Sequence, residues 1–120
     1  MVKRSAPKDE PDPTRSVRDE FYPKGRKRGF LVRIQVDFTR TGKLLRYSLV
    51  LIDTHLPGTD HGRVMGYDNA HGYHHRHYLG IVEPVEFKSY EDILYRFEAE
   101  YRQYLDEHQV PAIGEAARRR

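Results

Sequence analysis

Apolar and polar residues alternate from position 30 to position 38, which is the period-two pattern of a strand with one buried face. The apolar positions of this segment are Phe30, Val32, Ile34, Val36 and Phe38. A short glycine turn, Thr41-Gly42-Lys43, follows it, and residues 44–53 predict a second strand. Because so short a connection cannot form a parallel crossover, we expect the two strands to be antiparallel.

The rest of the chain predicts shorter strands and one helix. Residues 63–67 and 75–79 are typical of strands, and residues 85–87 of a brief extended piece. Ser89 is a favourable N-cap for a helix that ends near residues 108–110, before Pro111. The apolar stripe of this helix consists of Ile93, Leu94, Phe97, Tyr101, Tyr104 and Leu105. We therefore predict an α+β fold: a small antiparallel β-meander of about three to five strands, with one long C-terminal helix packed on one face.

Charge and proline content divide the chain into three parts. Residues 1–28 hold four prolines, nine basic and five acidic residues, which predicts a disordered basic N-terminal extension. Residues 29–110 form the single α+β domain, and residues 111–120 are a basic C-terminal tail. Basic ends favour nucleic acid through attraction to phosphate, although they can also be merely solvated.

Two features that the sequence lacks reduce the number of possible functions. The chain has no cysteine, which excludes disulfides and thiolate metal sites. It has no apolar run near the roughly 20 residues of a membrane span, and its beginning does not have the pattern of a signal peptide. We therefore expect a cytoplasmic protein that does not contact membranes.

The candidate chemistry lies between Gly66 and Tyr78, a segment rich in histidine. Residues two apart in a strand project from the same face, so His75 and His77 should lie together, with Arg76 on the opposite side. Such a pair suits metal-independent RNA cleavage, in which one imidazole accepts the 2′-hydroxyl proton and the other protonates the leaving oxygen. We expect no cofactor for this reaction.

Other polar residues complete this hypothesis. Arg76, Arg46 or Lys43 could stabilise the charge that develops on phosphate, and Tyr73 and Tyr78 could stack on a base or donate to phosphate. Asn69 could position a phosphate, whereas the negative charge of Asp68 fits a residue that orients a histidine. Asp68 and Asn69 are also common turn formers, which gives them a purely structural alternative.

A metal centre is a further possibility. A His-x-His pair can bind Zn²⁺, Mn²⁺ or Ni²⁺, with Asp68 or His71 as a third ligand. The remaining alternative is a solvated, histidine-rich turn.

Several of these motifs together resemble the TumE-like toxin family of bacterial type II toxin–antitoxin systems. The likeness covers residues 30–108 and is densest in Val64-x-Gly66-Tyr67-Asp68-Asn69, in His75-Arg76-His77-Tyr78, and in Val85-x-Phe87-x-Ser89-x-Glu91-x-x-Leu94-x-x-Phe97. It implies a small cytoplasmic toxin that attacks RNA or translation and pairs with an antitoxin carrying a helix-turn-helix domain. By position, the family's shared polar residues are Asp68, Asn69, His75, Arg76, His77 and Tyr78. The proline-rich extension and Arg118-Arg119-Arg120 depart from the family, which leaves open a standalone member or another partner.

Three functions follow, and the sequence does not choose finally among them. The leading one is a toxin that cleaves RNA, with His75, His77, Arg76 and Asp68 in the catalytic site and Asn69, Tyr78, Tyr73 and Arg46 binding substrate. The others are a non-enzymatic module that binds nucleic acid or protein, and a metal-dependent nuclease. A homodimer is also possible, because a short sheet leaves unpaired edges.

Overall fold

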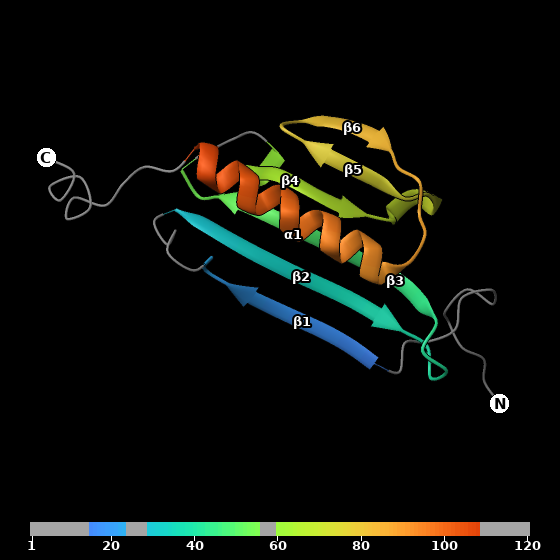
Figure 1. Cartoon of the computed structure of the whole chain (residues 1–120). Coiled ribbons are helices and arrows are strands. Elements are labelled where there is room, and N and C mark those ends of the chain that lie inside the picture. The colour runs from blue at the N-terminus through green and yellow to red at the C-terminus, as the bar shows by residue number, and fades with distance from the viewer. Residues whose placement is uncertain (1–14, 24–28, 56–59, 109–120) are drawn as a thin grey trace, which may run out of the picture.

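A computed structural model describes residues 15–23, 29–55 and 60–108 of the chain. These residues form an open six-stranded antiparallel sheet with strands in sequence order and one helix across one face (Figure 1). The strands are β1 (Arg15–Phe21), β2 (Phe30–Phe38), β3 (Leu44–Asp53), β4 (Arg63–Asp68), β5 (His75–Tyr78) and β6 (Ile81–Pro84), and the helix is α1 (Tyr90–Glu107). Two 3-10 turns, Asp60–Gly62 and Ala70–Gly72, flank β4. The predicted α+β meander with one long helix is confirmed.

The sheet is longer than predicted because β1 belongs to it. Residues 15–21 pair with β2 along the whole strand, from Arg15 opposite Phe38 to Phe21 opposite Val32. The prediction of disorder up to residue 28 is therefore wrong for these seven residues. Composition predicts whether a segment can form its own core, but an edge strand needs only a neighbour whose backbone groups are unpaired. Residues 1–14, 24–28 and 109–120 lie outside the described residues, so the rest of the extension and the C-terminal tail stay predictions.

The last strand also differs from expectation. Residues 81–84, and not 85–87, pair with β5. Pro84 is tolerated because β6 lies at the edge of the sheet, where a missing N–H leaves no neighbouring strand unsatisfied. The tight turn between β5 and β6 contains Leu79 and Gly80, both at positive φ.

The core lies between α1 and one face of the sheet. Alternate residues of β2, β3 and β4 face the helix, and its stripe covers them; the completely buried members include Val32, Leu49, Leu51, Val64, Ile93 and Phe97. Ser89 caps the helix, because its hydroxyl accepts the backbone N–H of Asp92 at 3.0 Å. No helix in the described part of the chain is long and apolar enough to cross a membrane.

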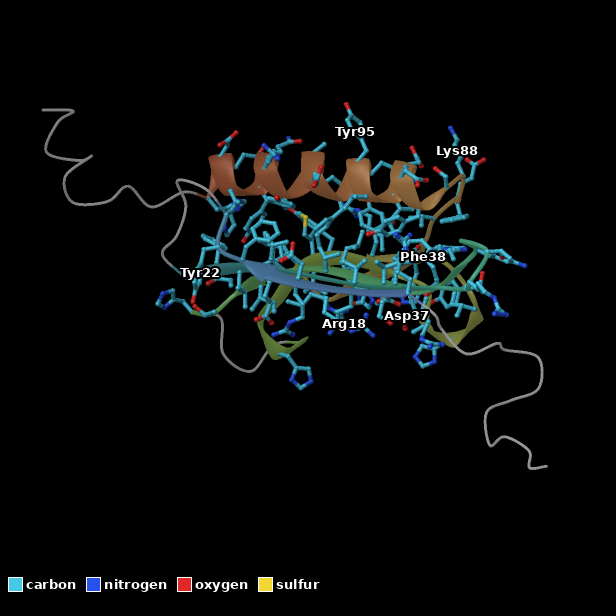
Figure 2. The ribbon with its side chains drawn as sticks, turned by 90° about the horizontal axis from the view of Figure 1, so that it is seen from below. Arg18, Tyr22, Asp37, Phe38, Lys88 and Tyr95 are labelled. Carbon is cyan, nitrogen blue, oxygen red and sulfur yellow. The ribbon has the colours of Figure 1, made fainter. Side chains whose placement is uncertain are left out.

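The opposite face of the sheet, which we call the open face, is not covered by α1. Figure 2 shows α1, with Tyr95 on its outer side, on one side of the sheet and Arg18 and Asp37 on the other. The strand register places a row of polar residues on the open face: Ser16, Arg18, Gln35, Asp37, Arg46, Ser48, Asp68, His75 and His77. The alternation that builds the core therefore also gathers polar side chains from five strands on one surface.

Candidate functional site

The pairing of β4 with β5 brings together three chemically active side chains. Asp68 lies opposite His75, and Gly66 lies opposite His77. All three side chains therefore point from the open face, and the two imidazole rings lie with their centroids 4.9 Å apart. The predicted juxtaposition of His75 and His77 is present. We call Asp68, His75 and His77 the histidine–aspartate cluster.

Asp68 is the centre of this cluster. Its Oδ1 lies 2.8 Å from Nε2 of His75, and its Oδ2 lies 3.0 Å from Nε2 of His77. Oδ1 also accepts the backbone N–H of Ala70 at 3.0 Å, and a guanidinium nitrogen of Arg63 is 3.7 Å from Oδ2. These contacts hold the carboxylate in place, and they agree with the expectation that Asp68 orients histidine.

The other ring nitrogens of the two histidines have different surroundings. Nδ1 of His75 lies 3.1 Å from the carbonyl oxygen of Tyr73, whereas Nδ1 of His77 is buried without a hydrogen-bond partner. Burial, together with the positive charge of Arg63, lowers the pKa of His77 even though Asp68 acts in the opposite direction. The one hydrogen-bonded ring nitrogen of His77 is therefore Nε2, which faces Oδ2 of Asp68.

Both rings are buried, and this differs from the solvent-facing pair that direct acid–base catalysis needs. His75 is 3% exposed and His77 is 8% exposed. Beside them lies an open recess of about 730 Å³, lined by β1 to β4 and by the turn that follows β4. Asp68 is the member of the cluster that lines this recess. A substrate in the recess would therefore meet the carboxylate before the rings.

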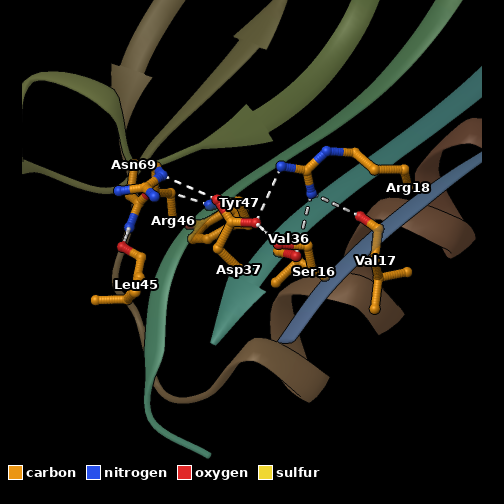
Figure 3. A network of polar contacts seen from close by, with 9 residues as sticks. All are labelled: Ser16, Val17, Arg18, Val36, Asp37, Leu45, Arg46, Tyr47 and Asn69. Carbon is orange, nitrogen blue, oxygen red and sulfur yellow. Dashed lines mark hydrogen bonds and ion pairs between the residues drawn. The ribbon is translucent and has the colours of Figure 1, made fainter. Parts of the chain in front are cut away.

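A second polar network, drawn in Figure 3, contributes Arg18, Asp37 and Arg46 to the lining of the same recess. Asp37 accepts hydrogen bonds from the hydroxyl of Ser16 at 2.7 Å and from Nε of Arg46 at 2.9 Å, and a guanidinium nitrogen of Arg18 lies 3.0 Å away. Burial alone would raise the pKa of Asp37, but the contacts from Ser16, Arg18 and Arg46 outweigh it and lower this pKa. Asp37 is thus a permanent anion that anchors two arginines on the open face.

Three of the predicted substrate-binding residues line the same recess. Arg46 and Tyr73 are about half exposed there, and the ring of Tyr73 lies 4.5 Å from that of His75. The Asn69 amide is occupied by the backbone of β3: its Oδ1 accepts the N–H of Tyr47, and its Nδ2 donates to the carbonyl of Leu45, each at 3.0 Å. Asn69 therefore has a structural role in the wall of the recess, but it bonds the backbone of a distant strand and not the local backbone that its turn-forming alternative predicts.

Arg76 and Tyr78 are not brought to this site. Both project from β5 toward α1, where Arg76 donates to Glu100 at 3.1 Å and to Glu83 at 3.0 Å, and its guanidinium lies 4.9 Å from the centre of the Tyr78 ring. The sheet separates them from the imidazoles. The proposed contact of either residue with substrate at the histidine–aspartate cluster therefore has no support in the geometry, because alternation sends odd and even positions to opposite faces.

Several site residues were missed by the sequence reasoning. Arg18 lay in the segment predicted to be disordered, although Ser16, Arg18 and Glu20 alternate as one face of an edge strand would. Gln35 and Asp37 were visible as the polar positions of the first predicted strand, but their spatial neighbours were not. Arg63, which contacts Asp68 from the far end of the same strand, had no local signal.

The donor set of the cluster also bears on the metal alternative. Asp68, His75 and His77 each offer a ligand atom, and these atoms lie within 4.8 Å of one another. In the part of the chain that the structure describes, this is the one such group of three or more histidine or acidic side chains. His71, the other candidate third ligand, lies on the exposed turn after β4 at φ 64° and does not belong to it.

Comparisons with known proteins add no relative: no protein-family model matches the chain, and no curated protein or solved structure is significantly similar to it. The resemblance to TumE-like toxins thus rests on the motifs alone.

Proposed function

We propose that this protein is a cytoplasmic toxin of a toxin–antitoxin pair that acts on RNA, and that RNA is cleaved in the recess of the open face. The single observation that carries the proposal is the convergence of Asp68, His75 and His77 beside a recess that also holds arginine side chains. Groups that can exchange protons, placed next to cations, are what cleavage of a phosphodiester requires.

The recess suits the backbone of single-stranded RNA. Arg18 and Arg46 are 51% and 45% exposed in their side chains, so each can contact a phosphate while Asp37 fixes its direction. Tyr73, 44% exposed, offers a ring on which an unpaired base can stack. Asp37 and Asp68 offset the two arginines, so the recess attracts RNA moderately and not through a large positive field.

The chemistry in this proposal begins at Asp68. RNA cleavage through the 2′-oxygen forms a bond from that oxygen to phosphorus and breaks the bond from phosphorus to the 5′-oxygen. One proton leaves the 2′-hydroxyl, and one reaches the 5′-oxygen. Because both rings are buried behind Asp68, His75 and His77 exchange protons with the substrate through the carboxylate and not by direct contact.

One alternative function is favoured by a specific observation. Buried imidazoles that are both held by Asp68 also suit a structural cluster, and the protein would then be a non-enzymatic module that binds RNA or an antitoxin. Among the residues that the structure describes, no further strand pairs with the outer edges of β1 and β6, so these edges could pair with a partner or a second copy of the chain, and Ile81 on β6 is 67% exposed. Binding without cleavage would select this alternative.

Incubation of purified, tag-free protein with end-labelled single-stranded RNA tests the proposal. We expect cleavage, and a loss of about 100-fold or more in rate for Asp68→Asn and for the double variant His75→Ala/His77→Ala. His61→Asn is the matched control, because His61 is an exposed histidine at φ 55°, a conformation that asparagine tolerates. Circular dichroism shows whether each variant is folded.

Growth of bacteria that express the chain without a partner provides the second readout. Induction should slow growth, Asp68→Asn should relieve it, and His61→Asn should not. If a folded His75→Ala/His77→Ala variant slows growth as much as the wild type does, the assignment of the catalytic site is wrong. If the wild type binds RNA in a salt-sensitive way but does not cleave it, the alternative of a non-enzymatic binding module replaces the proposed enzyme.

A further inference from the structure

We infer that Asp68, His75 and His77 bind one divalent transition-metal ion, such as Zn²⁺ or Mn²⁺. The three groups come from paired positions on two adjacent strands, so the sheet fixes their spacing without help from a flexible loop. Their ligand atoms already lie within 4.8 Å of one another. Two imidazole nitrogens and one carboxylate oxygen are a common set of protein ligands for these ions.

The hydrogen bonding of His75 is compatible with a metal ligand. In the tautomer with hydrogen on Nδ1, this N–H donates to the carbonyl oxygen of Tyr73 at 3.1 Å. Nε2 then carries the lone pair that can coordinate an ion, and it lies 2.8 Å from Oδ1 of Asp68. When no ion is bound, a proton shared between Nε2 and Oδ1 occupies the same place.

The contacts of the two rings suit metal ligands. A histidine that binds a metal usually donates its other N–H to a carbonyl or a carboxylate, and Tyr73 supplies this partner to His75. The Nε2 atom of the second ring, His77, lies 3.0 Å from Oδ2 of the same carboxylate, so both rings face the place where an ion would bind. Burial of both rings, which obstructs direct acid–base catalysis, is no obstacle to a ligand.

The same surroundings limit the affinity. Arg63 lies 3.7 Å from Oδ2 of Asp68, and its positive charge opposes a divalent cation. Nδ1 of His77 lacks the partner that would orient its ring. We therefore expect a dissociation constant in the micromolar range, weaker than that of a structural zinc site. Three protein ligands leave at least one coordination position for water, which is the arrangement of catalytic sites.

The consequence for catalysis rests on the function proposed above. With an ion bound, His75 and His77 would act as ligands and not as proton carriers. The ion would stabilise the charge that develops on phosphate while the 2′-oxygen forms its bond to phosphorus and the bond to the 5′-oxygen breaks. The 2′-hydroxyl proton would pass to solvent, and the 5′-oxygen would take up a proton from solvent. Binding of the ion itself does not depend on any activity toward RNA.

Calorimetric titration of chelator-treated, tag-free protein with ZnCl₂ and MnCl₂ tests the inference. We expect one ion per chain for the wild type and for His61→Asn, and an affinity at least about 10-fold lower for His75→Ala, His77→Ala and Asp68→Asn. Co²⁺ bound to the wild type gives a visible absorption spectrum that reports nitrogen ligands, so the inference stays testable even where a variant does not fold.

Nitrogen-15 NMR of the histidines distinguishes the ion from the proton. A wild type that binds no ion overturns the inference, whichever ring nitrogens of His75 carry hydrogen, as does binding that is unchanged in a folded His75→Ala variant. The RNA assay with and without chelator separates this result from the proposed function. If the protein binds the ion but does not cleave RNA, only the proposed nuclease activity is rejected. If it cleaves RNA in the presence of chelator and binds no ion, only the proposed metal site is rejected.

Discussion

Two carboxylates are buried on the open face, and their surroundings differ in kind. Asp37 is 6% exposed and contacts two guanidinium groups and a hydroxyl, whereas Asp68 is 8% exposed and contacts two imidazoles, a backbone N–H and, at longer range, Arg63. Arginine stays charged at every pH at which proteins fold, so the partners of Asp37 do not change. The charge of an imidazole changes near neutral pH, and its nitrogen can coordinate a metal.

The difference separates a structural carboxylate from a reactive one. Around Asp37 the partners keep their charges at neutral pH, and the network serves to aim Arg18 and Arg46 into the recess. Around Asp68 the partners are imidazoles, a kind of group that can exchange protons or coordinate a metal ion. A buried carboxylate therefore identifies a candidate site only when its partners can change their own state.

The largest expected effect comes from the close packing of β4 against β3, beside the histidine–aspartate cluster. Gly66 faces β3, and a Cβ at this position would overlap the carbonyl oxygen of Leu49, a backbone atom that cannot move aside. Gly66→Ala should therefore lower the free energy of unfolding by about 3 kcal/mol, measured by urea denaturation. Gly42→Ala is the control: Gly42 has φ +91° but nothing near its missing Cβ, so only backbone strain of about 1 kcal/mol is expected. If Gly66→Ala and Gly42→Ala lower the free energy of unfolding by equal amounts, the close approach of β3 and β4 at Gly66 is contradicted.

The next largest effect is on the free energy of unfolding, and it should differ between variants of the two carboxylates, Asp68 and Asp37. Asp68→Ala leaves two buried imidazoles facing no acceptor, and we expect a loss of about 2 kcal/mol in the free energy of unfolding. Asp37→Ala releases two arginines that are half exposed and that water can solvate, so we expect about 1 kcal/mol. Chemical denaturation of both variants at neutral pH, after treatment with chelator, makes the comparison. A larger loss at Asp37 would reverse the assignment of roles.

A smaller effect concerns RNA binding. Arg46→Gln should weaken binding of single-stranded RNA several-fold for all sequences, and the slope of log affinity against log salt should fall by about 1, because one phosphate contact is lost. Fluorescence anisotropy at several salt concentrations measures both quantities. Arg33→Gln is the control, since Arg33 contacts Glu20 outside the recess. If the two variants bind RNA alike, the recess is not the RNA site.

The smallest expected effect is on the pH dependence of stability. The pKa of Asp37 is lower in the folded state than in the unfolded chain, so its contribution to stability is present above about pH 4 and is lost as the pH falls through the folded-state pKa. Asp37→Asn should therefore make the acid side of the stability profile shallower. Urea denaturation at a series of pH values below neutrality measures the slope. An unchanged slope would mean that Arg18 and Arg46 do not stabilise the anion.

The fold was largely predictable from local patterns. Period-two alternation identified β2 and β3, and the capped amphipathic pattern after Ser89 identified α1, because burial on one face requires those spacings. β1 was missed because it contributes little to the core: six of its seven residues are exposed, and its order depends on the backbone of β2. No feature of residues 15–21 themselves predicts that they pair with β2.

The candidate site was predictable only in part. Alternation placed His75 and His77 together and also places Arg76 on the other side of the sheet, yet the sequence could not show that Arg76 is held there by Glu83 and Glu100. It also could not show the burial of the rings, which depends on the packing around them.

The sequence by itself determined strands β2 to β5, the helix and the face from which the two histidines project, because these follow from local geometry with periods of two and 3.6 residues. Tertiary structure alone decided which groups meet there. It placed Asp68 between the imidazoles, aimed Arg18 from an edge strand into the same recess and put Arg76 against the helix. These contacts depend on strand register and on which face the helix covers, quantities that join residues far apart in the chain.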